Sequence, residues 1–420
     1  MKKIRLWMVI SLLLFLTACN FAPNITTNVT TQTTNESDVV WLNISTKEQL
    51  MAMDLTKNYQ LVNDIDLGIE EWIPLGNQSV PFSGMFNGKG YTISNLRITL
   101  SHGGFVGLFG VVVGKVYDLK ITNVFIDVVH QGILYVGGLA GYVSNDVVDV
   151  FVSGNIVAQN HHSNTFAGLL AGFVTAKISS SMSATQFIPN ILENIQVEGT
   201  LSVNGKNFIY AGGLVGKLYN TKLKNIDVDA RLFIAHEQYR AYIGGVVGHN
   251  YSGILQGFES VITDPDIEQI GLRANVEIHV LSQGTRISVG GLMGYNNYGV
   301  ISQSAVNASF TLSAQEIVSG GIIGEDWQGT LQSLVVKVVY IIDPLSLHES
   351  KTLSLGGVSG YSNETTTYQF VYFTSSGSSL QNNMGSLLED VSLLTNAMFY
   401  SSDLNWDEPI YILPSIELFD

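Results

Sequence analysis

The segment Val136–Gly141 (VGGLAG) recurs with small variations along the 420-residue chain and sets its organisation. The closing glycines of successive copies are 31, 31, 44, 32, 46, 30 and 36 residues apart, which indicates a base period of about 31 residues with insertions. A fixed period of this size is typical of a solenoid, in which one repeat forms one structural unit. The eight copies are Val106–Gly110, Val136–Gly141, Ala167–Gly172, Ala211–Gly216, Ile243–Gly248, Val289–Gly294, Ser319–Gly324 and Leu355–Gly360.

Each period reads as β-structure. From residue 115 the chain runs KVYDLKITN, VFIDVVHQG, ILYVGGLAG, three stretches of β-branched and aromatic residues separated by Asn, Gly and His. No helical periodicity competes within the array. Three short strands per period predict an all-β parallel β-helix with one coil per repeat and about 9–11 coils. Glycine suits the corners, where it permits unusual backbone angles and leaves room for neighbouring coils.

The motif resembles the GLUG repeat (Gly-Leu-hydrophobic-Gly) of bacterial surface proteins, which also occurs in the non-catalytic part of some immunoglobulin A metallopeptidases. The resemblance includes leading segments and a closing segment and covers about residues 42–415. It implies that the β-helix is right-handed. The flanking segments are Tyr59–Leu67 (YQLVNDIDL), Trp72–Gly76, Phe82–Leu96 and Leu394–Tyr400 with Trp406 and 412–413.

A solenoid exposes apolar cross-sections at its two ends, so caps are expected. Ser45 and Glu48 have the spacing of a capping box, and we expect a short helix over Thr46–Leu55 at the N-terminal end. The stretch Gly385–Tyr400 is expected to cover the other end and to be partly helical. The predicted units are residues 39–105 (N-terminal cap and leading coils), 106–375 (repeat β-helix) and 376–420 (C-terminal cap).

The N-terminus predicts export and anchoring. A basic start, Met1–Arg5, precedes the apolar run Leu6–Leu16, which is too short to span a bilayer and is typical of a signal peptide. The run ends in Leu16-Thr17-Ala18-Cys19, which resembles the bacterial lipoprotein signal. The resemblance implies cleavage after residue 18 and a lipid on Cys19, the single cysteine of the chain, which would hold the protein on the extracytoplasmic face of the membrane. Residues 19–38 are rich in Thr and Asn and are expected to form a flexible tether.

Composition excludes several classes of protein. One cysteine rules out a disulfide scaffold, and charged residues make up only 13% of the chain. The formal net charge of −15 argues against nucleic acid as a partner. No phosphate-binding loop is present, so no cofactor is expected.

The sequence gives little support for a metal site. His236-Glu237 and His348-Glu349 each lack the second histidine of an H-E-x-x-H zinc helix, so the metallopeptidase site of the resembling proteins is not expected here. The tandem pair His161-His162 lies between two strands and is read as a coil corner. We therefore expect no metal site.

Two groups of carboxylates are candidates for chemistry. Asp64 and Asp66 alternate on one strand and could serve a glycoside hydrolase, but a structural role in the leading coil is favoured. Asp264, Asp266 and Glu268 alternate like calcium ligands but lack the glycine and the distal glutamate of a calcium loop. An acidic surface loop is favoured there.

The leading hypothesis is a lipid-anchored, non-catalytic bacterial surface protein that binds a glycan or a host or surface protein, or acts as a spacer. The alternatives are a β-helical polysaccharide lyase or glycoside hydrolase and a subunit of a larger surface assembly. Recognition is expected on an aromatic strand face or on the insertions, because solenoid insertions emerge as loops. The insertions are Phe173–Asn190, Phe258–Arg273 and Leu345–Lys351.

Overall fold

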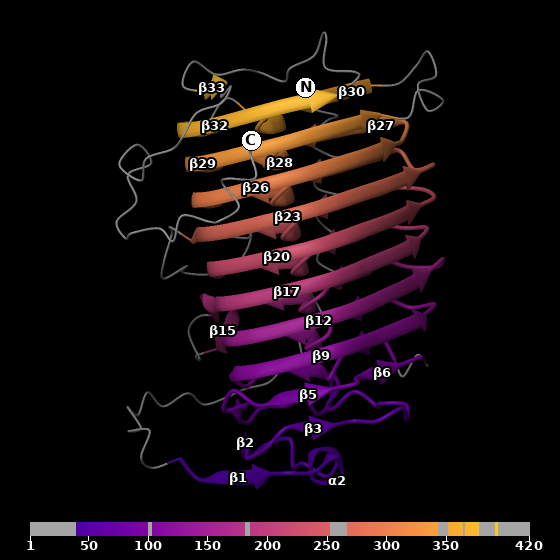
Figure 1. Ribbon diagram of the computed structural model, residues 1–420, viewed down its shortest axis with the longest axis vertical. Coiled ribbons are helices and arrows are strands. Elements are labelled where there is room, and N and C mark those ends of the chain that lie inside the picture. Colours follow the sequence, from indigo (N-terminus) through magenta and orange to yellow (C-terminus); the bar gives the residue numbers. More distant parts are fainter. Residues whose placement is uncertain are drawn as a thin grey trace.

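The protein is a parallel β-helix, as predicted from the repeats. The computed structural model describes residues 39–99, 103–180, 185–252, 267–342, 352–363, 366–377 and 391–393. Within these ranges the chain winds in stacked coils, and each strand pairs in parallel with the strand at the same place in the next coil (Figure 1). Three sheets run along the rod: one sheet of long strands and two sheets of short strands.

The long-strand sheet gathers the first strand of every coil. Within the repeats its strands are 11–16 residues long. Its main path is β1 (Trp41–Ile44), β2 (Asn58–Leu61), β4 (Phe86–Asn87), β9 (Val116–Val129), β12 (Val147–Asn160), β17 (Asn190–Gly205), β20 (Thr221–His236), β23 (Glu268–Ser282), β26 (Val300–Ser313), β29 (Thr330–Ile342), β32 (Thr367–Gly377) and β33 (Val391–Leu393). The short leading strands β3 (Ile65–Asp66), β5 (Thr92–Ser94) and β6 (Arg97–Ile98) join it from the side.

The two short-strand sheets flank the repeated motif. The first short sheet precedes each glycine corner and consists of β7 (Phe105–Val106), β10 (Leu134–Val136), β13 (Thr165–Gly168), β18 (Ile209–Gly212), β21 (Arg240–Gly244), β24 (Arg286–Gly290), β27 (Glu316–Gly320) and β30 (Thr352–Gly356). The second short sheet follows it and consists of β8 (Phe109–Val112), β11 (Ala140–Val143), β14 (Ala171–Thr175), β19 (Val215–Tyr219), β22 (Val247–Tyr251), β25 (Met293–Asn297), β28 (Ile323–Trp327) and β31 (Ser359–Ser362).

The division of a coil into three strands differs from the prediction. The stretches KVYDLKITN and VFIDVVHQG, expected as two strands, form the single strand β9, whereas ILYVGGLAG is split between β10 and β11. Asn123 interrupts the pattern with a left-handed φ of 53°, yet the parallel ladder continues on both sides of it. One left-handed residue therefore bends a long strand without ending it.

The motif glycines serve close approach rather than unusual backbone angles. Among the described residues, none of the glycines with positive φ belongs to the repeated motif. A Cβ on Gly245 would instead lie 2.0 Å from the carbonyl oxygen of Gly291, its counterpart in the next coil. A Cβ on Gly213 would lie 2.1 Å from the carbonyl oxygen of Gly245. From Gly213 to Gly291, neighbouring coils are thus in close backbone contact at this corner, with no room for a side chain, whereas Leu169 stands at the corresponding place one coil earlier.

Left-handed conformations occur at matched places in the long strands instead. Asp118, Asp149, Asn194 and Asn225 share one place in four successive coils, and all have φ between 53° and 56°. Asn and Asp tolerate this region better than other non-glycine residues. Their side chains connect the coils, because Asn194 Nδ2 donates to Asp149 Oδ1 over 2.8 Å and Asn225 Nδ2 donates to Asn194 Oδ1 over 3.1 Å.

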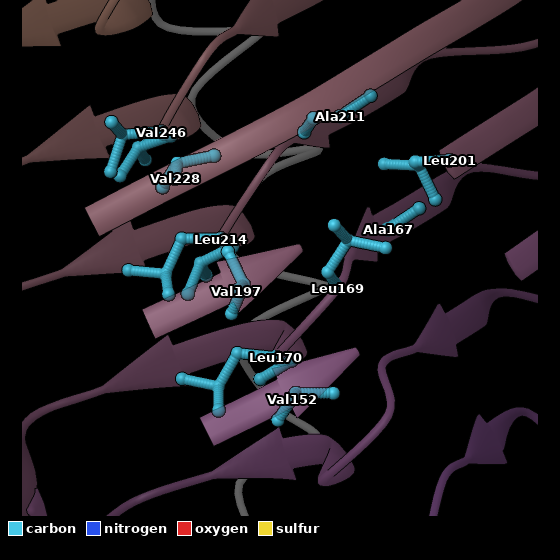
Figure 2. Packing of buried hydrophobic residues seen from close by; sticks show 14 of the residues in the cluster. Val152, Ala167, Leu169, Leu170, Val197, Leu201, Ala211, Leu214, Val228 and Val246 are labelled. Carbon is cyan, nitrogen blue, oxygen red and sulfur yellow. The ribbon is translucent and has the colours of Figure 1, made fainter. Parts of the chain in front are cut away.

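The core is a set of apolar ladders inside the coils. Leu170, Leu214 and Val246 stack from coil to coil at the glycine corner, and the valines of the long strands face them (Figure 2). The ladder Val152, Val197 and Val228 follows the register of β12, β17 and β20. These side chains are almost fully buried, so each coil adds a further layer to one continuous core.

The predicted capping helix is present but shorter than expected. α2 (Lys47–Met51) lies at the N-terminal end of the rod (Figure 1), and its Leu50 is buried in the core. The N-cap is Thr46 rather than Ser45, because the side-chain oxygen of Thr46 accepts from Gln49 N while Gln49 Oε1 accepts from Ser45 N over 2.8 Å. The capping box is therefore shifted by one residue. The helix ends before Asp54, whose carboxylate accepts from Thr56 and forms a turn.

The other end is described only in part. Of the predicted C-terminal cap segment Gly385–Tyr400, only β33 lies within the described residues, and it pairs in parallel with β32 instead of being helical. The signal peptide and the tether lie outside the described residues. Within the described ranges, no helix is long and apolar enough to cross a membrane.

Candidate binding surface

The carboxylates of the leading coil connect backbone segments. Asp64 Oδ1 accepts from the backbone N–H of Thr92 over 2.8 Å. Asp66 Oδ1 accepts from Asn95 Nδ2 over 2.7 Å and from Gly68 N over 2.8 Å, and these hydrogen bonds lower the pKa of Asp66. Both residues line a shallow pocket of about 500 Å³ beside α2, where Lys47 Nζ is 2.6 Å from Glu70 Oε2. Each carboxylate thus joins the segment around β3 to the segment around β5, with which β3 pairs.

The histidine pairs occupy coil corners. At His161-His162 the backbone N–H of His162 donates to Asn160 Oδ1, and His161 Nδ1 is 3.4 Å from Glu237 Oε1. His236 is buried: its Nε2 donates to the Asn207 carbonyl over 2.9 Å, so its Nδ1 accepts from Ser282 Oγ over 3.0 Å. Burial lowers the pKa of His236 and keeps the ring neutral at pH 7. The contacts of His236 therefore connect the turn after β20 to the corresponding turns after β17 and β23 in the two neighbouring coils.

Several predicted residues lie outside the described residues: Cys19, Asp264, Asp266 and the pair His348-Glu349. Glu268 is described, and its carboxylate accepts a hydrogen bond from Ser302 Oγ in the next coil. Within the described ranges, no group of three or more His, Cys, Asp or Glu side chains is arranged to hold a metal ion.

An aromatic column runs along the first short sheet, outside the main core. The rings of Phe105, Tyr135, Phe166, Tyr210 and Tyr242 stack with centroids 4.7–5.5 Å apart and planes within 15° of parallel. Side chains of the second short sheet pack against this column, among them Phe173, with its ring 5.9 Å from that of Phe166. Phe166, Tyr210 and Tyr242 are at most 9% exposed. The column is therefore chiefly a second packing layer that joins the two short sheets.

The column ends in charged side chains. After Tyr242 the same place on the first short sheet is taken by Ser288, whose hydroxyl donates to Glu325. Arg286 pairs with Glu316 and with Glu325 at N–O distances of 3.2 and 3.1 Å. Glu325 is 3% exposed, so the ion pairs replace ring stacking where the aromatic residues stop.

A second group of rings is partly open to solvent, with two of its five members exposed. It lies at the corner between the second short sheet and the long-strand sheet and is called the tyrosine edge below: Tyr219, Tyr251, Tyr298, Trp327 and Tyr361. The Tyr219 and Tyr251 rings stack at 5.4 Å, and the Trp327 and Tyr361 rings are also 5.4 Å apart. Tyr298 is 49% exposed and Tyr361 is 41% exposed. This edge has the exposure that a binding surface needs.

The first insertion leaves the coil as an antiparallel hairpin, formed by β15 (Lys177–Ser180) and β16 (Thr185–Ile188). Its return is held by Asn190, whose Oδ1 accepts from Lys177 N over 2.8 Å. The prediction that this insertion leaves the coil is correct for the hairpin, but its predicted first residues, Phe173–Thr175, belong to β14, and Asn190 already begins β17. Most of the second insertion and all of the third lie outside the described residues.

Sequence reasoning placed recognition on an aromatic face without naming its residues. For the column a signal was available, because an aromatic residue stands immediately before the leading apolar residue of five motif copies. For the tyrosine edge the local signal was Asn297-Tyr298-Gly299 beside Trp327-Gln328-Gly329, one coil apart. The positions come together only through the register of β25 and β28.

The fold and these surfaces define a parallel β-helix repeat protein. No protein-family model matches the chain. Over 92 residues it is 39% identical to a "Putative Gly-rich membrane protein" of Evansella cellulosilytica, and this alignment covers 20% of the chain. The chain matches only 10% of the length of that relative.

One solved structure is similar at low identity. It is the crystal structure of a "putative immunoglobulin A1 protease" from Bacteroides ovatus, with a TM-score of 0.43 and 16% sequence identity. The alignment covers 82% of this chain and 85% of that one. At this level of similarity the fold assignment rests on the strand pairing of the chain itself.

Proposed function

We propose that this chain is a lipid-anchored bacterial surface protein whose β-helix is a non-catalytic rod, used for binding or as a spacer. The main support for a non-catalytic role comes from Asp64 and Asp66, the two carboxylates considered for hydrolysis. Both accept hydrogen bonds that connect leading segments of the chain. A general acid needs a raised pKa, whereas hydrogen bonds lower the pKa of Asp66. The partial relative described as a membrane protein agrees with a location at the cell envelope. Nucleic acid remains an unexpected partner because of the acidic net charge.

The anchor is tested at Cys19. Radiolabelled palmitate is expected to enter the wild-type chain in bacterial cells, and Cys19→Ser should abolish both labelling and membrane retention. Acyl chains contribute about 0.8 kcal/mol per buried CH₂, so their loss releases the rod from the membrane. A Ser11→Ala variant in the apolar run serves as the control and should label normally. Equal labelling of Cys19→Ser would refute the anchor.

The rival function, a carbohydrate-cleaving enzyme, is tested with a polysaccharide depolymerisation screen on the full chain. We expect no cleavage above background, measured as new reducing ends and by mass spectrometry of released oligosaccharides. Cleavage that Asp64→Asn or Asp66→Asn abolishes, while the variants keep their unfolding midpoints, would establish the enzyme instead. Asp54→Asn provides a matched control, since Asp54 also accepts from a backbone N–H in the leading segment.

A further inference from the structure

The tyrosine edge is continuous along the rod axis. Tyr219, Tyr251, Asn297 and Trp327 share one place in four successive coils, each in register with the next. At the coil where Asn297 replaces an aromatic residue, the neighbouring Tyr298 supplies a ring. Its backbone N–H donates to the Trp327 carbonyl over 3.0 Å, which fixes it at the start of the turn into β26. Aromatic side chains are therefore present at every coil of this edge from β19 to β28.

A tyrosine at position 298 is conformationally unfavourable. Its φ is 59°, in the left-handed region that bulky side chains disfavour. At the corresponding turns of other coils the left-handed residue is Asn220, with φ 47°, or Gln328, with φ 62°. Half of the Tyr298 side chain is exposed, so core packing does not explain the ring. Strained residues that folding does not require are found preferentially at functional sites.

The chemistry of the edge indicates its ligand. Tyrosine and tryptophan combine a rigid apolar ring with a polar group, and the amides Asn297 and Gln328 lie at the same corner. The in-register positions of the edge repeat with the spacing of the coils, about 4.8 Å, and the Tyr219 and Tyr251 rings stack at 5.4 Å. A matching ligand is long, repeats along its length, and offers both apolar faces and hydroxyl groups. The net charge of −15 disfavours an anionic polymer.

We propose that the tyrosine edge binds a neutral polysaccharide lying along the rod, with Tyr298 as the principal contact. The proposal deepens the binding role given above and rests on it. Tyr251 and Tyr298 would contact neighbouring sugar units through ring faces or edges and hydroxyl groups, while Asn297 and Gln328 donate and accept hydrogen bonds. A protein partner would need a broader patch than this single corner supplies.

The test measures binding of the full chain, in detergent, to immobilised β-glucan, mannan and galactan, with polygalacturonate as the anionic probe. The wild-type chain is expected to bind at least one neutral polymer and not the anionic one. Tyr298→Asn should weaken that binding by about tenfold or more, the effect expected on removing one stacking aromatic ring. Its unfolding midpoint should stay the same or rise, because Asn suits the left-handed turn.

Tyr239→Asn is the matched control. Tyr239 is 50% exposed, against 49% for Tyr298, and lies at a different corner, where its ring stacks on Phe208. This variant should bind as the wild type does. The proposal is overturned if both variants lose binding equally, if neither does, if Tyr298→Asn lowers the unfolding midpoint, or if no neutral polymer binds. Palmitate labelling of Cys19 decides the anchor separately, so failure at the edge leaves that result intact.

Discussion

Replacing Gly245 by alanine is expected to destabilise the rod severely, by about 3 kcal/mol or more. The new Cβ would lie 2.0 Å from the Gly291 carbonyl oxygen and 3.0 Å from Val276 Cγ2. The carbonyl belongs to the backbone of the next coil, so relief requires two coils to separate. Because coils are stabilised by their neighbours, the damage spreads beyond one repeat. Urea unfolding followed by far-UV circular dichroism measures the loss.

Gly132→Ala is the control for this change. Gly132 also lies outside the left-handed region, but its added Cβ would meet only the imidazole of His130, 3.0 Å from Nε2. A flexible ring can move aside, and alanine restricts the unfolded chain, so the free energy of unfolding should change by less than about 1 kcal/mol. Equal unfolding midpoints for Gly245→Ala and Gly132→Ala would contradict the close packing of coils at the motif.

Asp326→Asn is expected to stabilise the protein at pH 8, by about 2–4 kcal/mol. Asp326 lies inside the rod at the end of a hydrogen-bonded column, in which Asn250 Nδ2 donates to Asn296 Oδ1 and Asn296 Nδ2 donates to Asp326 Oδ1, both over 2.9 Å. All three side chains are fully buried. Burial raises the pKa of Asp326 from 3.8 to about 7, although hydrogen bonds from Asn296, Thr366 and the Trp327 backbone oppose the shift. Asparagine keeps the acceptor for Asn296 without the buried charge.

The pH dependence of the stability difference distinguishes the raised pKa of Asp326 from other effects of the substitution. Between pH 4 and 7 the folded state keeps a proton on Asp326 that the unfolded state has lost, so this contribution to stability is full below pH 4 and disappears as the pH rises through 7. The stability difference between the variant and the wild type should therefore be small at pH 4 and grow up to pH 8. Burial lowers the pKa values of His236 and His249, which costs stability as the pH falls below 6.5. Those losses are common to both proteins and cancel in the difference. A difference that does not change with pH would refute the shifted pKa.

The repeat was recognisable from the sequence because one kind of contact recurs along the rod. Motif glycines pack against the backbone of the neighbouring coil and return about every 31 residues, although Leu169 stands in place of the second glycine in one copy. The fold class and the presence of an N-terminal helix could therefore be predicted. The structural role of Asp64 and Asp66 also agreed with the sequence, since both accept hydrogen bonds within the leading segments.

Other features depend on which residues of neighbouring coils, far apart in sequence, lie side by side. Asn123 resembles a strand end, but pairing of β9 with β12 carries the strand past it. Asn250, Asn296 and Asp326 look like ordinary polar turn residues, and only their register across β22, β25 and β28 places them in one buried column.

Local sequence patterns and contacts between coils account for different features of this protein. Glycine spacing and the recurrence of β-branched residues are local properties, and they suffice for a parallel β-helix. The tyrosine edge and the pKa of Asp326 arise from coils 30–46 residues apart that are brought into contact by backbone pairing. Stacking turns residues that are distant in the chain into neighbours, and burial then changes their chemistry.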